Sequence, residues 1–384
     1  MPRTGKTIPA GELTAKVAVV VGTRPGIIKM SPVIGELKRR GTEFILIHTG
    51  QHYSNNMDRV FFRELDLPES DYHLRRPRRG SLHGEQTAHM LKGMELILLE
   101  AKPRLVLVCG DANTNLAAAL AARKLHVAVG HVEAGFRSFD WAMPEEHNRV
   151  MIDHISDLLF APTEECRAHL LAERVRGEIF VTGNTVVDAA IRNSTLAAEQ
   201  SRILKRLGIE KRPYMVATIH REENVDGRER LGQIVSILNA VTREVGMPLF
   251  MPLHPRTRSR LETYQLYEKL EDSEQIIPLK PLGYLDFLLL LGRTRLVLTD
   301  SGGIQQESCT LRVPCVTLRE NTESTEAVRV GANLVAGLEE RHVVAAVRTM
   351  LERPREWANP YGDGLASRRI VDVVAGWEPG KGAS

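Results

Sequence analysis

Three acidic residues could remove a proton from a carbon atom or donate one to it. Each follows a point where an apolar or helical pattern ends in a turn, the kind of place where ligands bind. Asp111 comes after the apolar run 105–109 and a glycine, Glu133 closely follows the run 127–130, and Glu145 follows a short loop. A single acid at such a place is equally well explained as a helix cap or a surface charge. Carboxyl groups crowded together shift one another's pKa and suit proton abstraction and donation. We therefore interpret the three acids as one candidate catalytic group.

A second group of residues could bind a phosphate. Ser301, Gly302 and Gly303 follow an apolar run and open a helical pattern. Glycines let the backbone approach a ligand closely, and the N-terminus of a helix offers free N–H groups and a partial positive charge to an anion. Glu307 could accept hydrogen bonds from a ribose, and Arg319 follows closely. Together these residues predict a nucleotide half-site.

Three further side chains could serve the same anion. His220 ends the apolar run 214–219 beside an arginine, and a protonatable histidine near a pyrophosphate can stabilise the charge on a departing nucleotide. Arg24 and Lys29, early in the chain, offer cations. For Lys29 a position on a solvated helix face is an almost equally good interpretation.

The elements that must position these residues alternate between buried strands and amphipathic helices. Such alternation predicts an α/β fold with doubly wound parallel sheets, in which ligands bind beyond the carboxyl ends of the strands. We expect two Rossmann-like domains facing a cleft: 1–190 with the acids, 191–365 with the nucleotide half-site, and 366–384 as a helix crossing back to the first domain, followed by a tail. The strands are expected at 16–21, 44–48, 105–109, 127–130, 158–162, 179–183, 214–219, 249–253, 275–279, 296–299 and 313–318, with helical segments at 57–64 and 185–211 among others.

Composition excludes several classes of function. The chain has 384 residues, 43% of them hydrophobic, and a formal net charge of +3, which is too small to indicate nucleic-acid binding. A basic run at 75–79 fits a solvated loop or a dock for an anionic ligand. The apolar runs are too short for a membrane span, the N-terminus lacks the apolar core of a signal peptide, and the four cysteines lack CxxC spacing. The sequence therefore predicts a cytoplasmic protein.

The known cofactor and metal motifs do not occur. The chain has neither a GxGxxG fingerprint nor a Walker lysine, so neither NAD nor ATP is indicated. Its histidines lack HExxH or Cys/His spacing, and it has no GxSxG elbow. We expect no metal and no cofactor.

The motifs, in their order, resemble those of the non-hydrolysing UDP-N-acetylglucosamine 2-epimerases over about residues 17–374. They are GTRP at 22–25, TGQHY at 49–53, GD at 110–111, HVEAG at 131–135, PEE at 144–146, VTGNTVVD at 181–188, HR at 220–221, PLHPR at 252–256 and DSGG at 300–303. RSFD at 137–140 and NVD at 224–226 resemble the branch common in archaea and some bacteria.

This resemblance implies a GT-B fold and a two-step reaction without a cofactor. A carboxylate removes the proton from C2 as UDP leaves C1, which gives a bound glycal, and UDP then adds back with a proton delivered to the other face. A homodimer is also implied. By position, the catalytic residues would be Asp111, Glu133, Glu145 and His220, and the UDP contacts would be Arg24, Lys29, Ser301, Gly302, Gly303, Glu307 and Arg319.

The chain departs from the family pattern at three places near the expected site. Gly26 replaces the usual glutamate, Ala112 replaces a threonine, and Ser324 replaces an arginine. Three functions remain open at this point: a UDP-HexNAc 2-epimerase acting on UDP-GlcNAc or a modified UDP-sugar, a hydrolysing epimerase or glycosyltransferase on the same fold, and a non-catalytic UDP-sugar-binding protein.

Overall fold

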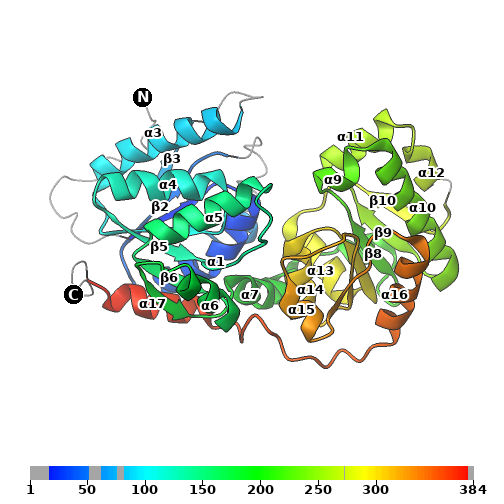
Figure 1. Cartoon of the computed structure of the whole chain (residues 1–384). Helices are drawn as coiled ribbons and strands as arrows, with labels where there is room; N and C mark the ends of the chain where they lie inside the picture. The colour runs from blue at the N-terminus through cyan, green and yellow to red at the C-terminus, as the bar shows by residue number, and fades with distance from the viewer. Residues whose placement is uncertain (1–16, 52–61, 76–81, 272, 379–384) are drawn as a thin grey trace. The chain divides into compact units, whose positions relative to one another are not determined.

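Two all-parallel sheets organise the chain, each inside a compact unit of its own (Figure 1). The computed structural model describes residues 17–51, 62–75, 82–271 and 273–378. The first unit comprises residues 1–189 and 362–384, and the second comprises 190–361. The predicted α/β fold with two Rossmann-like domains is confirmed.

In the first unit the described strands form a seven-stranded sheet in the order β3-β2-β1-β4-β5-β6-β7. The central strands β1, β4 and β5 are buried along their whole length, as expected where helices cover both faces of a parallel sheet. The strands are β1 Val17–Val21, β2 Phe44–His48, β3 Tyr72–His73, β4 Leu105–Cys109, β5 Ala128–Val132, β6 Leu158–Ala161 and β7 Glu178–Val181. The helices are α1 Arg24–Arg39, α3 His83–Ala101, α4 Asn113–Lys124, α5 Pro144–Ile155, α6 Glu164–Ala172, the start of α7 Thr185–Gln200, and α17 Ala366–Gly376.

In the second unit the described strands form a six-stranded sheet in the order β10-β9-β8-β11-β12-β13. Its strands are β8 Met215–Thr218, β9 Leu249–Pro252, β10 Ile276–Leu279, β11 Leu296–Thr299, β12 Cys315–Thr317 and β13 Asn333–Val335. Its helices after α7 are α8 Ile203–Leu207, α9 Glu222–Val225, α10 Arg228–Val245, α11 Pro255–Thr263, α12 Tyr267–Glu271, α13 Tyr284–Arg293, α14 Gly302–Thr310, α15 Thr325–Arg329 and α16 Glu340–Glu352.

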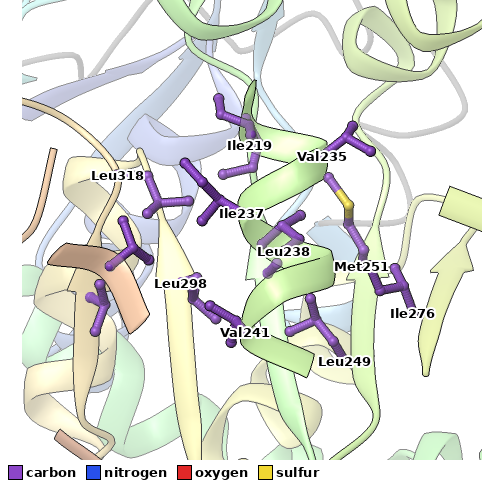
Figure 2. Close-up of a cluster of buried hydrophobic side chains, with 14 of the residues drawn as sticks. Ile219, Val235, Ile237, Leu238, Val241, Leu249, Met251, Ile276, Leu298 and Leu318 are labelled. Carbon is purple, nitrogen blue, oxygen red and sulfur yellow. The ribbon is translucent and has the colours of Figure 1, made fainter. Parts of the chain in front are cut away.

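The largest described core of the second unit lies between its sheet and helices α10 and α16. Figure 2 shows Ile237, Leu238 and Val241 of α10 packed over Leu249 of β9 and Leu298 of β11, and each of these side chains is fully buried. Burial of apolar surface of this kind stabilises by about 25 cal/mol per Å². This core fixes the strands whose carboxyl ends carry His220 and Ser301.

The last helix returns to the first unit. In Figure 1 the red helix α17 lies with the blue and green elements of that unit, and it packs against α1. Asp188 of α7 caps its start, because its carboxylate accepts hydrogen bonds from the backbone N–H groups of Ala366 (3.2 Å) and Ser367 (2.8 Å) and from the Ser367 hydroxyl (2.6 Å). The side chain of a residue far away in sequence thus satisfies free donors of the helix.

The structure adds to and corrects the expected elements. The two short strands β3 and β13 had not been predicted, and the expected helical segment 185–211 is two helices, α7 and α8. Most of the expected helix 57–64, of the basic run 75–79 and of the tail lies outside the described residues, as do His52 and Tyr53. No helix in the described part of the chain has both the length and the apolar character needed to cross a membrane.

Candidate active site

Glu133 and Lys29 form a close ion pair at the carboxyl edge of the first sheet. Glu133 directly follows β5, and its carboxylate oxygens both lie 2.6 Å from Nζ of Lys29, which α1 presents from one turn inside the helix. The side chain of Glu133 is 8% exposed and that of Lys29 is 20% exposed. Burial would lower the pKa of Lys29, but the Glu133 carboxylate beside it raises that pKa from 10.5 to about 12. Lys29 is therefore charged and orients Glu133, and it does not lie on a solvated helix face.

The backbone at this turn is unusual. Glu133 has φ +72°, a left-handed conformation that few residues other than glycine adopt, and Gly110 at the end of the neighbouring strand has φ +74°. A Cβ on Gly110 would lie 2.9 Å from Oε2 of Glu133, so glycine is needed there for the carboxylate to fit. The turns after β4 and β5 are thus shaped around one carboxyl group. Strained backbone of this kind is concentrated at functional sites.

Asp111 shares this region and has a cation of its own. Arg149 of α5 donates to Asp111 Oδ2 at 2.5 Å and to Glu146 at 2.8 Å. The charge of Asp111 also acts on Lys29, as does that of Glu133, so the structure brings these two predicted acids to one place. Two carboxylates, each with its own cation, are suited to taking and giving a proton on opposite sides of a substrate carbon.

Glu145 and Glu146 lie side by side at the start of α5 and differ sharply. Glu145 is exposed, whereas Glu133 is paired with Lys29 and Asp111 with Arg149. Glu146 is buried and accepts hydrogen bonds from the backbone N–H groups of Ser138 (3.0 Å) and Phe139 (3.1 Å). Burial would raise the pKa of Glu146, but the hydrogen bonds from Ser138 and the guanidinium group of Arg149 hold it below its usual range. Glu146 therefore organises the loop before α5, while Glu145 is available to a ligand.

In the second unit, a buried aspartate holds the turn that carries His220. Asp300 follows β11 and accepts hydrogen bonds from the backbone N–H groups of His220 (3.1 Å) and Arg221 (3.0 Å) and from the Asn224 side chain (3.1 Å). Burial lowers the pKa of His220 below its usual value, Asp300 opposes this effect, and Arg221 adds to it. In the free protein the ring is therefore neutral at neutral pH.

The start of α14 carries the predicted phosphate-binding residues under two arginines. Ser301 is the N-cap residue, and Gly302 is buried in the first turn. Glu323 lies over this turn, and a Cβ on Gly302 would be 2.5 Å from its Oε1. Arg221 and Arg319 each contact Glu323 at 2.8 Å. Burial would raise the pKa of Glu323, but the two arginines hold it below its usual range.

The remaining predicted contacts occupy distinct environments. Gly303 is exposed next to Gly302 on α14, and Arg24 is partly buried at the first position of α1, after Thr23, which caps that helix. Glu307 is buried on α14 and accepts a hydrogen bond from the hydroxyl of Tyr284 at 3.0 Å. The assignment of Glu307 to a ribose stays a prediction, as do the other expected ligand contacts.

The structure shows the surroundings of the three residues that depart from the family pattern, Gly26, Ser324 and Ala112. The backbone N–H of Gly26 donates to the Thr23 hydroxyl at 3.2 Å, and a Cβ on Gly26 would come within 3.1 Å of that oxygen. Ser324 is fully buried before α15, where the nearby arginines Arg221 and Arg319 are engaged with Glu323. Ala112 is the N-cap residue of α4 without a side-chain cap, and nothing in the structure explains it.

Sequence reasoning missed the residues that hold the candidate acids and the histidine. Asp300 falls within the DSGG motif but received no role, and neither Arg149 nor Asp153 was assigned one. Glu146, Arg149 and Asp153 recur at intervals of three and four residues, which places them on one face of α5. That spacing was the available signal for the first unit. Among the described residues, no three or more His, Cys, Asp or Glu side chains are grouped so as to hold a metal ion, and the expectation of a metal-free site stays a prediction.

Comparison with known proteins gives consistent matches over nearly the whole chain. A family model described as UDP-N-acetylglucosamine 2-epimerase matches residues 35–375. A UDP-N-acetylglucosamine 2-epimerase of Methanococcus maripaludis is 47% identical, over 94% of this chain and 98% of that protein. A UDP-2,3-diacetamido-2,3-dideoxy-D-glucuronate 2-epimerase of Pseudomonas aeruginosa is 41% identical, over 94% and 99%. The crystal structure of the Methanocaldococcus jannaschii UDP-GlcNAc 2-epimerase in complex with UDP-GlcNAc and UDP matches with a TM-score of 0.87 and 46% identity, over 94% and 99%.

Proposed function

The chain belongs to the UDP-N-acetylglucosamine 2-epimerase family, and we propose that it inverts C2 of a UDP-N-acetylhexosamine, by default UDP-GlcNAc to UDP-ManNAc, without hydrolysis. The observation that supports this most directly is a pair of acids beyond the ends of the neighbouring strands β4 and β5. Glu133 forms an ion pair with Lys29, and Asp111 forms one with Arg149. Inversion at carbon requires a proton to leave one face and another to arrive on the opposite face. Two separately oriented carboxyl groups meet that requirement.

The proposed reaction has two steps. One carboxylate takes the proton from C2 while the C1–O bond breaks, so that the electron pair of the C2–H bond forms the C1–C2 double bond of a glycal and UDP leaves. UDP then adds back to C1 while a carboxyl group delivers a proton to the other face of C2. We assign this acid–base chemistry to Asp111, Glu133 and Glu145. The site must exclude water from the glycal, because water adding in place of UDP would hydrolyse the substrate.

The proposed role of the second unit is to hold UDP and stabilise it as it leaves. The N-terminus of α14, with Ser301, Gly302 and Gly303, would bind the diphosphate. Arg319 and Arg221 already bind a carboxylate, that of Glu323, so their guanidinium groups lie where an anion is accepted. His220 is neutral in the free protein, and the negative charge of a diphosphate beside it would favour its protonation.

Incubation with UDP-GlcNAc in D₂O, followed by proton NMR, tests the proposal. We expect the H2 signal of the substrate to disappear as deuterium enters at C2, together with new signals of a manno-configured UDP-sugar. Glu133→Gln should abolish this exchange while UDP binding persists, and Glu95→Gln, an exposed residue of α3, serves as the control. Exchange by Glu133→Gln at near the parent rate would show that the acid is wrongly assigned. Release of free UDP with free ManNAc would identify a hydrolysing enzyme instead.

A modified UDP-sugar is the second candidate substrate. The loss of an arginine at Ser324 changes the charge near α14, and one relative of 41% identity is named for a diacetamido uronate substrate. If UDP-GlcNAc gains no deuterium, UDP-2,3-diacetamido sugars are the next substrates to test, and failure of both would leave a non-catalytic binding protein. The homodimer and the cytoplasmic location stay predictions, and light scattering of the purified protein tests the former.

A further inference from the structure

A buried charged cluster lies beside the two acids, and the proposed chemistry does not use it directly. His131 of β5 and Asp153 of α5 are both fully buried, and Nδ1 of the histidine lies 2.6 Å from Oδ1 of the aspartate. Arg137 contacts the other oxygen of Asp153 at 2.8 Å and also Glu173 at 2.7 Å. Buried charges persist only when they are paired and hydrogen-bonded, so this arrangement has a structural or functional reason.

Both ring nitrogens of His131 face hydrogen-bond acceptors. Nδ1 faces the Asp153 carboxylate, and Nε2 lies 3.2 Å from the backbone carbonyl oxygen of Gly110. A neutral imidazole has one N–H and one lone pair, so it would direct that lone pair at one of these two oxygens. Only the imidazolium, with a proton on each nitrogen, satisfies both contacts.

If His131 is an imidazolium, the charges of the side chains around its ring also balance. The groups facing His131 are Asp153 on α5 and, through Asp153, Arg137 on the loop after β5, while Glu173 after α6 pairs with Arg137. Glu173 also lies 3.6 Å from His154 on the exposed side of the cluster. With His131 protonated, the positive charges of His131 and Arg137 are balanced by the negative charges of the buried Asp153 and the partly exposed Glu173. Burial would raise the pKa of Asp153, but His131 and Arg137 hold it below its usual range.

The cluster holds the two turns that carry the candidate acids. The His131 ring links Asp153 to the backbone carbonyl of Gly110, the residue directly before Asp111. Oδ2 of Asp153 also accepts a hydrogen bond from the backbone N–H of Gly135, two residues after Glu133, at 3.1 Å. Glu133 and Gly110 both have positive φ. Such conformations persist only when the surroundings hold them. The ring therefore bridges the ends of β4 and β5 at the point where this strain is located.

We propose that His131 is a positioning residue for the acids: as an imidazolium it donates to Asp153 and to the Gly110 carbonyl, and so fixes Asp111 relative to Glu133. The catalytic part of this proposal rests on the proposed function, whereas the protonation of the ring does not.

The protonation of the ring can be tested without any assay of activity. Long-range ¹H–¹⁵N correlation spectra of protein labelled with ¹⁵N in histidine, at pH 7.5, report the state of each ring nitrogen. The His131 signals are those missing from the spectrum of His131→Asn or of His131→Gln, so either variant suffices for the assignment. We expect the shifts of two protonated nitrogens. A neutral tautomer, with one unprotonated nitrogen, would overturn the proposal even if the protein proves to be an active epimerase.

The same two variants separate the two hydrogen bonds. The amide nitrogen of asparagine replaces Nδ1 and keeps the contact with Asp153, whereas that of glutamine replaces Nε2 and keeps the contact with the Gly110 carbonyl. We expect His131→Asn to lower kcat by about a hundredfold with little change in KM, as a small misplacement of a catalytic group does, and His131→Gln to retain more activity. Equal kcat values for the two folded variants would refute positioning through Gly110. If neither variant folds, the spectrum of Asp153→Asn decides, since removal of the anion should convert the ring to a neutral tautomer and change its ¹⁵N shifts.

Discussion

Lys29→Met removes the cation that orients Glu133, and its effect on stability can be worked out from the structure. The ammonium group lies 2.6 Å from both carboxylate oxygens, and the two side chains are 20% and 8% exposed. A carboxylate left in this place without its partner is partly desolvated and unpaired, which is destabilising. We therefore expect the variant to be less stable than the parent protein.

The pKa of Lys29 sets the size of the effect. It rises from 10.5 to about 12 although burial opposes the rise, and this corresponds to about 2 kcal/mol in favour of the ammonium form. Because the pKa is higher in the folded protein, this contribution is fully present below pH 10.5 and is lost as the pH rises through about 12. Measurements at pH 7.5 therefore contain all of it.

A double-mutant cycle isolates the pair. Urea denaturation, followed by circular dichroism, would give the free energy of unfolding of the parent, Lys29→Met, Glu133→Gln and the double variant. The net rise in the Lys29 pKa, in which burial opposes Glu133 and Asp111 adds to it, sets only the scale of the coupling energy, which we expect to be on the order of 2 kcal/mol. The double variant should therefore lose less stability than the two single variants together. Lys38→Met makes the same substitution at an exposed position of the same helix and should change stability by less than about 0.5 kcal/mol.

One result would refute this reasoning. If the losses of the two single variants add up to that of the double variant within about 0.5 kcal/mol, the pair is not coupled. Lys29 would then be free to contact the diphosphate, as the sequence had suggested, and would not serve Glu133.

UDP binding should take up protons near neutral pH, because burial lowers the pKa of His220 in the free protein and a diphosphate beside the ring would raise it. Calorimetry in two buffers of different ionisation enthalpy measures the uptake, and the same uptake by His220→Asn would contradict the assignment. Asp188→Ala should destabilise the start of α17 by about 1–2 kcal/mol, because its carboxylate caps that helix from α7. Amide exchange should become faster in α17 but not in β8, and unchanged exchange in α17 would show that the cap contributes nothing.

Much of the fold could be predicted from the sequence, because period and composition are local properties. Fully apolar runs such as those that became β1 and β4 occur only where helices cover both faces of a sheet, so their alternation with amphipathic helices indicated two parallel sheets. The strands β3 and β13 escaped detection because runs of two and three residues are too short to show a period.

The sequence predicted which types of residue form the candidate site and at which strand ends they lie. It was less informative about which side chains contact one another. Asp111 and Glu133 follow neighbouring parallel strands, whose carboxyl ends lie on one edge of the sheet, so their proximity followed from topology. The choice between Glu145 and Glu146 did not follow in the same way. Neighbouring residues at the start of a helix point in different directions, and only packing decides that Glu146 is buried while Glu145 is exposed.

The sequence by itself determined the family, the two parallel sheets and the acids at the strand ends, since these depend on local patterns and on the order of motifs. Only the tertiary structure decided which charges pair. Lys29 and Glu133 are 104 residues apart, and His131 and Asp153 are 22 residues apart on a strand and a helix. Partners at such separations meet only when the sheet is assembled, and burial then selects the few pairings that leave no charge unpaired.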